Sequence, residues 1–119
     1  MTIALITGSC GLVGSESSIF FSKKGFKILG VDNNTRKLLF GKDGDISWIK
    51  QNLKKKIKNY IHFNTDITNY KSLEKIFKKY RSKISVIIHC AAQPSHDWAY
   101  KDPFMDFDVN AMSTFSLLN

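Results

Sequence analysis

The chain has 119 residues, of which 43% are hydrophobic and 24% are charged, with 9 Phe, 4 Tyr and 2 Trp. This length suits one domain, and this balance can form a packed core, which argues against intrinsic disorder, collagen-like repeats and a disulfide scaffold. No apolar run approaches the ~20 residues that a membrane-spanning helix needs. The short apolar segment at the N-terminus has no basic stretch before it, so no signal peptide is expected. These features predict a cytoplasmic protein without a membrane partner.

The net charge of +8 raises the question of nucleic-acid binding. The basic residues concentrate at 54–58 and 71–83, and in the second stretch apolar residues recur at helical spacing between lysines. This pattern is typical of an amphipathic helix with a solvated face, and no aromatic or glycine-rich nucleic-acid motif accompanies it. No nucleic-acid partner is therefore expected. The two cysteines, Cys10 and Cys90, and the three histidines do not complete a metal-ligand spacing, so no metal is expected either.

The first part of the chain predicts a strand, a helix and a second strand. Residues 2–7 are aliphatic and β-branched, which indicates a buried strand. A helix is predicted after Gly14, because apolar residues are followed by two lysines and a glycine at 23–25. Residues 26–31 are the second apolar run and predict the second strand.

The middle of the chain is less regular. Residues 35–47 carry two glycines among charges and are predicted to be a long irregular excursion, and 46–57 is predicted to be a helix. Residues 60–63 predict a third strand. Asn69 is a suitable N-cap for the amphipathic helix, which is expected to end at about residue 81.

The last part contains the most apolar predicted strand, residues 85–89, then a polar loop over 93–103 and a helix from about 104 to the terminus. Strands that alternate with helices imply parallel pairing with right-handed crossovers. The sequence therefore predicts an α/β protein with a Rossmann-type doubly wound parallel sheet, here a partial one of four strands in the order 3-2-1-4.

Three glycines, Gly8, Gly11 and Gly14, follow one another at a spacing of three between the first strand and the first helix. A tight turn needs positive φ, a pyrophosphate needs an approach without a Cβ, and the helix must pack close to the sheet; three glycines can meet these needs. The free N–H groups of Leu12 and Val13 and the helix dipole would then face phosphates. The turn lacks the Lys-Ser/Thr ending of a P-loop, which disfavours phosphoryl transfer. An ordinary glycine-rich turn is the alternative.

Asp32 lies at the end of the second strand, where a carboxylate can accept hydrogen bonds from both ribose hydroxyls of an adenosine. The same carboxylate would repel a 2′-phosphate, so NAD is favoured over NADP. Arg36 and Lys37 are close enough in sequence to hold such a phosphate, which keeps NADP open. S-adenosylmethionine is a third possibility, but methyltransferase turns usually follow G-x-G-x-G.

These residues, with three later segments, resemble the extended short-chain dehydrogenase/reductases, and among them the NAD-dependent nucleotide-sugar epimerases and dehydratases. Asp66 and Ile67 resemble the pair with which this family contacts adenine, and 89–92 resembles the segment whose backbone lines the nicotinamide side. Asn110 matches the asparagine that supports the family's active site. The resemblance covers essentially the whole chain.

The resemblance implies NAD as the cofactor and a nucleotide sugar as the substrate. The cofactor-binding residues that it implies are Gly8, Cys10, Gly11, Leu12, Val13, Gly14, Asp32, Asn33, Asn34, Asp66, Ile67, Ala91, Ala92, Gln93 and Asn110. The stretch 91–98 is its most specific part and is similar to members that act on a CDP-linked dideoxyhexose, which places Ser95, His96 and Asp97 in a substrate-side loop. Because consecutive side chains point in different directions, these three are not expected to form a catalytic triad.

The sequence also departs from the family, whose catalytic base is a tyrosine with a lysine four residues later. The four tyrosines, Tyr60, Tyr70, Tyr80 and Tyr100, have at that distance Asn64, Glu74, Ile84 and Phe104. No catalytic residue is therefore assigned. Ser113 stands where the family usually has glycine. Residues 1–119 are expected to be the N-terminal part of an NAD-binding domain without its remaining strands or its substrate domain, and to be inactive alone.

Two further interpretations stay open. The chain could instead be a non-catalytic NAD-binding or interaction module that completes a site with a partner chain, or it could belong to another nucleotide-sugar epimerase or dehydratase. In the partial sheet, the strand 85–89 would have an uncovered apolar edge, which predicts self-association or contact with a partner chain there.

Overall fold

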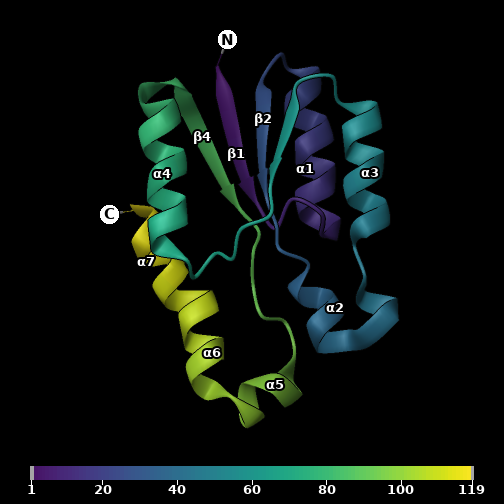
Figure 1. Cartoon of the computed structure of the whole chain (residues 1–119), viewed down its shortest axis with the longest axis vertical. Helices are drawn as coiled ribbons and strands as arrows, with labels where there is room; N and C mark the ends of the chain where they lie inside the picture. The colour runs from purple at the N-terminus through teal and green to yellow at the C-terminus, as the bar shows by residue number, and fades with distance from the viewer. Residues whose placement is uncertain (1, 119) are drawn as a thin grey trace.

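The computed structural model describes residues 2–118 and is built around one parallel sheet (Figure 1). Its strands are β1 (Ile3–Thr7), β2 (Lys27–Val31), β3 (Tyr60–Phe63) and β4 (Ile84–His89). They lie in the order β3-β2-β1-β4, as predicted, and all pairs are parallel. Thr7 pairs with Val31 on one side and with His89 on the other, so these three strands end at the same level.

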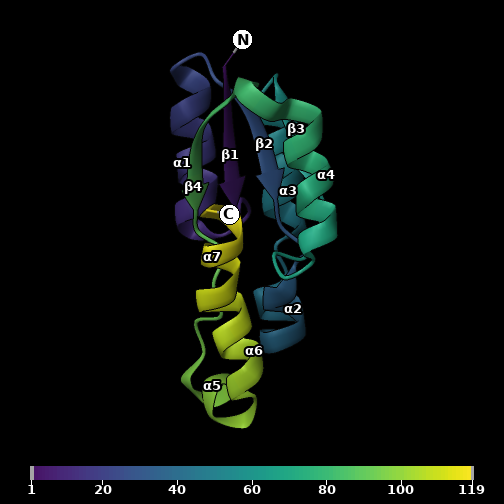
Figure 2. The ribbon, with the colours of Figure 1, turned by 90° about the vertical axis from the view of Figure 1, so that its left-hand side faces the viewer.

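Helices cover both faces of the sheet (Figure 2). One face packs against α1 (Leu12–Lys23) and α3 (Ser47–Lys56), with Ile6, Ile28 and Leu53 at the centre of that core. The other face packs against α4 (Tyr70–Tyr80), where Leu5, Leu29 and Ile76 are buried together. The short 3-10 turn Arg81–Lys83 leads from α4 into β4. The predicted cap of α4 is confirmed, because the Asn69 side chain accepts a hydrogen bond from the Ser72 amide at 3.2 Å.

Two segments beyond the carboxyl ends of the strands differ from the prediction. The excursion predicted over 35–47 is instead largely helical, with α2 (Thr35–Phe40) and a 3-10 helix (Gly41–Gly44) before α3. The loop predicted over 93–103 contains α5 (His96–Lys101). In α5 the Ser95 hydroxyl accepts from the Trp98 amide at 3.2 Å, so a local N-cap outweighed the polar composition on which the loop was predicted.

The C-terminal helix is a chain of three helical segments rather than one regular helix. It consists of α6 (Pro103–Phe107), a π-helical segment (Asp108–Met112) and α7 (Ser113–Leu118). Asp102 caps α6 by accepting from the Met105 amide at 3.0 Å, and Pro103 occupies its first turn, where no N–H partner is lost. Figure 1 shows α2, α5 and α6 beyond the arrowheads of the strands, so they surround the space into which the strands point.

β3 and β4 are the two edge strands of the sheet. β4 pairs with β1 on one side only among the described strands, and Ile87 in it is 36% exposed. The association predicted at this edge has no partner chain to test it and stays a prediction. Within residues 2–118, no helix is both long enough and apolar enough to cross a bilayer.

Candidate functional site

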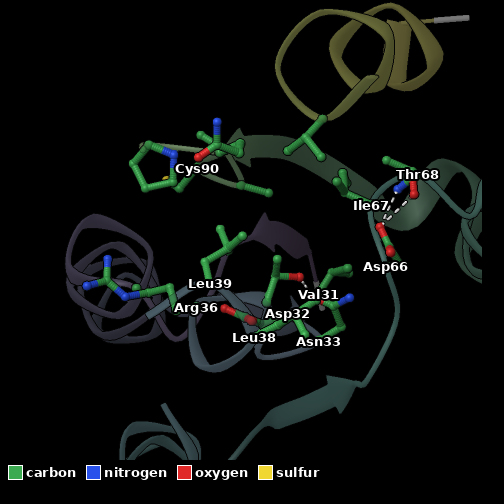
Figure 3. A pocket seen from close by; sticks show the side chains of 18 of the residues that line it. Val31, Asp32, Asn33, Arg36, Leu38, Leu39, Asp66, Ile67, Thr68 and Cys90 are labelled. Carbon is green, nitrogen blue, oxygen red and sulfur yellow. Dashed lines mark hydrogen bonds between the residues drawn. The ribbon is translucent and has the colours of Figure 1, made fainter. Parts of the chain in front are cut away.

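A cavity of about 650 Å³ opens at the carboxyl ends of the strands. One wall, here called the turn side, is formed by the glycine turn, the end of β2 and α2. The opposite wall, the loop side, is formed by the segment after β4 and by the helix that begins with α6. Figure 3 looks into this cavity, with Asp32 and Asn33 on the turn side, Cys90 on the loop side and Asp66 beside them. Ligands bind at this position in open α/β sheets.

Two of the three glycines of the turn, Gly8 and Gly14, are required by close contacts. Gly8 has φ +63°, and a Cβ there would lie 2.8 Å from the Ala91 nitrogen. A Cβ on Gly14 would lie 2.0 Å from the Gly8 carbonyl oxygen, whereas on Gly11 the same atom would be 3.3 Å away. The turn is closed by two backbone bonds, from Gly8 N–H to the Val31 carbonyl at 2.7 Å and from Gly11 N–H to the Gly8 carbonyl at 3.0 Å. No side chain larger than hydrogen fits at Gly8 or Gly14 without moving backbone.

The turn places the N-terminus of α1 at the cavity. The helix begins at Leu12, and Leu12 and Val13 are 81% and 63% exposed and line the cavity with Gly14. The first N–H groups of a helix have no acceptor within the helix and carry the positive end of its dipole. This wall therefore offers main-chain donors to an anion, as expected of a phosphate site.

Asp32 lines the cavity just beyond β2. Its Oδ2 accepts from the Cys10 amide at 3.1 Å and its Oδ1 from the Asn34 amide at 2.9 Å, so the carboxylate is fixed between the turn and the next residues. A carboxylate has about four acceptor sites, and these two bonds leave capacity for further donors from the cavity. Cys10 itself is fully buried below the turn, where burial raises the pKa of its thiol to about 11.

The two asparagines after Asp32 face different ways. Asn33 lines the cavity and its side chain accepts from the Thr35 hydroxyl. Asn34 adopts φ +63°, and its amide group donates to Asp45 Oδ1 at 2.7 Å and accepts from the Ile46 amide at 3.1 Å. The Asn34 side chain therefore ties the start of α2 to the start of α3 and is outside the cavity lining.

Asp66 and Ile67 border the cavity after β3, together with Thr65 and Thr68. Asp66 Oδ1 accepts from the Thr68 amide at 2.9 Å and from the Thr68 hydroxyl at 2.7 Å, as the dashed lines in Figure 3 show. Ile67 is 6% exposed and belongs to the core on the α4 face. This part of the cavity lining thus has one carboxylate, Asp66, held by Thr68, next to the buried apolar side chain of Ile67.

On the loop side, Ala91 and Ala92 line the cavity with their neighbours Cys90 and Pro94. The Ala91 amide donates to the Thr7 hydroxyl at 3.1 Å. The same hydroxyl lies 2.6 Å from His89 Nδ1, and burial lowers the pKa of His89. His89 is thus a hydrogen-bonded histidine at the end of β4.

Four residues hold the loop side against the C-terminal helix, and they are called the clasp below: Gln93, Asp106 and Asn110 through their side chains, and Ser95 through its main chain. Asn110 accepts from the Gln93 amide at 2.7 Å and donates to the Gln93 carbonyl at 3.2 Å and to Asp106 at 3.0 Å. The Gln93 side chain, in a residue only 5% exposed, donates to Asp106 at 2.8 Å and accepts from the Ser95 amide at 2.6 Å. Asn110 therefore supports the cavity wall from behind and does not line it.

The three residues predicted for a substrate-side loop lie in or next to α5. Ser95 is the N-cap, and His96 and Asp97 form the first turn of that helix. None of the three lines the cavity. Whether they contact a substrate stays a prediction.

Sequence reasoning missed part of the cavity wall. On the turn side α2 contributes Leu38 and Leu39 beside Arg36, already a candidate from the sequence, and on the loop side α6 contributes Phe104 and Met105. The Trp98 indole N–H donates to the Leu39 carbonyl at 3.3 Å, which joins the two walls. The apolar pair Leu38–Leu39, three residues after Thr35, was the available signal for a helix in the supposed excursion. Among residues 2–118 no cluster of His, Cys, Asp or Glu is arranged to hold a metal.

The fold is that of a Rossmann-type α/β protein. It has a parallel sheet with crossover helices, and a glycine turn next to Asp32, the acidic residue that follows β2. Comparison with known sequences is more specific: the model of the GDP-mannose 4,6 dehydratase family matches residues 5–119. The chain therefore belongs to this family of short-chain dehydrogenase/reductase epimerases and dehydratases, which confirms the family resemblance seen in the sequence.

The chain is similar to several curated members. UDP-glucuronate 4-epimerase of Thermodesulfobacterium geofontis is 34% identical to it over 96% of this chain and 33% of the relative. CDP-paratose 2-epimerase of Salmonella typhi is 29% identical over 96% of this chain and 31% of the relative. The chain thus spans about a third of the length of these relatives, and neither substrate is singled out.

Solved structures agree with the fold. A UDP-glucose 4-epimerase of Thermus thermophilus, solved as a complex with NAD, superposes with a TM-score of 0.66 at 26% identity. The match covers 98% of this chain and 32% of that one.

Proposed function

We propose that this chain binds NAD in the cavity and is the first part of the NAD-binding domain of a nucleotide-sugar epimerase. The observation that carries the proposal is that three features meet at one cavity: a glycine turn with no room for a Cβ at Gly8 or Gly14, the N-terminus of α1, and the Asp32 carboxylate. The family and the NAD complex of a structural relative support it.

In this proposal each wall has a separate task. The N–H groups at the start of α1 receive the pyrophosphate, and the spare lone pairs of Asp32 accept the adenosine ribose hydroxyls. Asp66 and Ile67 border the adenine, and the main chain at Ala91 and Ala92 faces the nicotinamide. When bound, NAD would take a hydride from a sugar carbon and return it to the other face.

A base that removes the hydroxyl proton is not assigned to any residue of this chain, because none of the four tyrosines has a lysine four residues later. The relatives are about three times as long as this chain, which supports the view that the base and the substrate domain belong to further chain or to a partner. Turnover by residues 1–119 alone is not expected.

For the substrate we propose a nucleotide sugar, and within that class a CDP-linked dideoxyhexose as in CDP-paratose 2-epimerase. The sequence stretch 91–98 supports this choice, and the Salmonella typhi relative is consistent with it. A UDP-linked sugar is the competing candidate, since the UDP-glucuronate relative has the higher identity. Equilibrium binding of CDP and UDP to the NAD-loaded protein, extended by its downstream sequence, would choose between them.

The coenzyme is tested by calorimetric titration of the folded chain with NAD, NADP and S-adenosylmethionine. We expect heat with NAD and a weaker response to NADP. Asp32→Asn should weaken NAD binding by about tenfold to a hundredfold, because charge-assisted hydrogen bonds contribute about 1.5–3 kcal/mol. The matched control is Asp43→Asn in the 3-10 helix outside the cavity lining, which should bind NAD like the wild type.

Circular dichroism of Asp32→Asn must show a folded protein for its affinity to count, because Asp32 also accepts from Cys10 and Asn34. A folded wild-type chain that gives no heat with NAD, or that prefers S-adenosylmethionine, would contradict the proposal.

A further inference from the structure

The glycine turn contacts Asp32 directly through the Cys10 amide. Polar side chains below the turn connect it to Asp32 a second time. The Ser9 hydroxyl lies 3.0 Å from the Tyr60 hydroxyl, which lies 2.8 Å from His62 Nδ1. His62 Nε2 lies 3.1 Å from the Asp32 carbonyl oxygen, and the Asp32 carboxylate accepts from the Cys10 amide at 3.1 Å. Because Ser9 and Cys10 are neighbours in the chain, these contacts form a closed circuit, called the polar ring below.

The direction of each hydrogen bond along the side chains of the ring follows from the Asp32 carbonyl and from the protonation state of His62. A carbonyl oxygen can only accept, so His62 must donate from Nε2 to Asp32. In a neutral imidazole Nδ1 is then the acceptor, which requires the Tyr60 hydroxyl to donate to it. The Tyr60 oxygen is left to accept from the Ser9 hydroxyl. These directions belong to a neutral His62 with a protonated Tyr60; an imidazolium would instead donate from Nδ1 to the Tyr60 oxygen and turn the Tyr60 hydroxyl toward Ser9.

Burial favours a neutral His62 and a protonated Tyr60. Ser9 is fully buried and Tyr60 is 9% exposed. Burial raises the pKa of Tyr60, with smaller contributions from Cys10 and Asp32, and it lowers the pKa of His62. Lys50 and Lys54 of α3 also lower the pKa of His62, while the hydrogen bond to the Asp32 carbonyl opposes them.

Strand β2 leaves space for the polar ring at Gly30. A Cβ on Gly30 in β2 would lie 2.1 Å from the Tyr60 oxygen and 2.7 Å from the Ser9 oxygen. Only glycine at this position leaves room for the two hydroxyls to meet under the turn. Neither Tyr60 nor His62 lines the cavity, so whatever they do for a ligand must act through Ser9 and Asp32.

We propose that Tyr60 and His62 are positioning residues for the coenzyme, which hold the glycine turn and the Asp32 carboxylate in one fixed relation through the polar ring. This inference rests on the proposed NAD binding. The turn presents the donors for the pyrophosphate, and Asp32 presents the acceptors for the ribose. Two groups of one ligand must be met at once, so a wall that holds both groups in place before binding increases affinity.

The test compares Tyr60→Phe with Tyr80→Phe. Both tyrosines are 9% exposed, but Tyr80 lies in the core on the opposite face of the sheet and is not part of the ring. We expect Tyr60→Phe to weaken NAD binding about tenfold in calorimetric titration, and Tyr80→Phe to leave it within about twofold of the wild type. His62→Gln keeps both a donor and an acceptor and should bind NAD more tightly than His62→Leu, which has neither.

A second readout examines the ring without coenzyme. In ¹⁵N NMR of the wild type, His62 should carry its proton on Nε2. Tyr60→Phe removes the donor to Nδ1, which stabilises the neutral ring, so the pKa of His62 should rise in this variant and stay unchanged in Tyr80→Phe. Amide exchange of β3 should stay as in the wild type in Tyr60→Phe, because exposure of His62 would also raise its pKa.

The outcomes separate the two proposals. Equal NAD affinity in folded Tyr60→Phe and Tyr80→Phe, or a His62 proton on Nδ1, would overturn the positioning role while NAD binding stands. A wild type with the expected tautomer that binds no NAD would overturn the proposed function, and the positioning role with it, but not the ring itself.

Discussion

The two walls of the cavity are held in place by different means. On the turn side, Gly8 and Gly14 are packed against backbone atoms, and the partly buried polar ring lies beneath them. On the loop side, the segment after β4 is held by the clasp, in which the side chain of the exposed Asn110 binds the main-chain N–H and C=O of the buried Gln93.

This difference matters for how each wall can fail. Backbone packed on backbone has no side chain that can rotate away, so a small addition on the turn side affects the whole fold. A clasp of side chains depends on individual hydrogen bonds, so a substitution there should loosen one loop before it affects the sheet. The predictions below test this contrast, starting with the largest effect.

Gly14→Ala should destabilise the protein most. The new methyl would lie 2.0 Å from the Gly8 carbonyl oxygen. The backbone fixes the position of the methyl, and the oxygen is itself a backbone atom, so neither can rotate away. We expect a loss of about 3 kcal/mol in the free energy of unfolding measured with urea. In Gly11→Ala the same distance is 3.3 Å, and the loss should stay below about 1 kcal/mol. Equal losses in the two variants would contradict the packing argument.

Gln93→Ala should destabilise the protein by about 1–3 kcal/mol, because Asp106 and the Ser95 amide lose a buried partner. Amide hydrogen exchange of residues 91–95 should accelerate, while that of β1 and β2 is unchanged. Gln51→Ala, at an exposed site in α3, is the control and should change neither quantity. Equal acceleration of amide exchange in all strands would show that the clasp stabilises the whole sheet and not only residues 91–95.

Acidification should lower the free energy of unfolding through two histidines, one near each wall. Burial lowers the pKa of His62 under the turn side and of His89 under the loop side. The unfolded chain therefore binds protons first as the pH falls below about 6.5, and stability is lost from there down to the folded-state pKa values. Urea unfolding between pH 7 and pH 5 should show this loss, and His62→Gln should reduce its slope. A flat profile in the wild type would contradict the burial of both rings.

The smallest effect concerns the β4 edge, which borders the loop side. Ile87→Lys should weaken self-association measured by sedimentation, because a charged side chain disfavours edge-to-edge pairing. Leu38→Lys, at a 79% exposed site on α2, adds the same charge away from the edge and serves as the control. A monomeric wild type at all concentrations would contradict the prediction of an associating edge.

The turn side could be predicted largely because its signals are local in the sequence. Gly8, Gly11 and Gly14 are spaced for one turn, and the strand order follows from alternating strands and helices. The polar ring could not be predicted, because it joins residues far apart in the chain. One signal was available: Gly30 inside an apolar strand indicates close approach of another group, but it does not say which.

The loop side was predicted less well. Asn110 was assigned to support the active site, and its bonds to Gln93 fit a supporting position, yet the direct cofactor contact is untested. The loop expected around Ser95 is a capped helix, since polar composition alone does not distinguish a loop from a short helix with a good N-cap. Two partners of Gln93, Asp106 and Asn110, come from a helix more than ten residues away, and no spacing rule connects them with Gln93.

The bond between Trp98 and the Leu39 carbonyl gives the molecule an optical probe of its own. The indole lies where the two walls meet, so its fluorescence depends on their separation. The other tryptophan, Trp48, is 67% exposed and can be replaced by phenylalanine to leave a single emitter. Any compound that spreads the walls or draws them together could then be followed by emission wavelength, without a label attached to the protein.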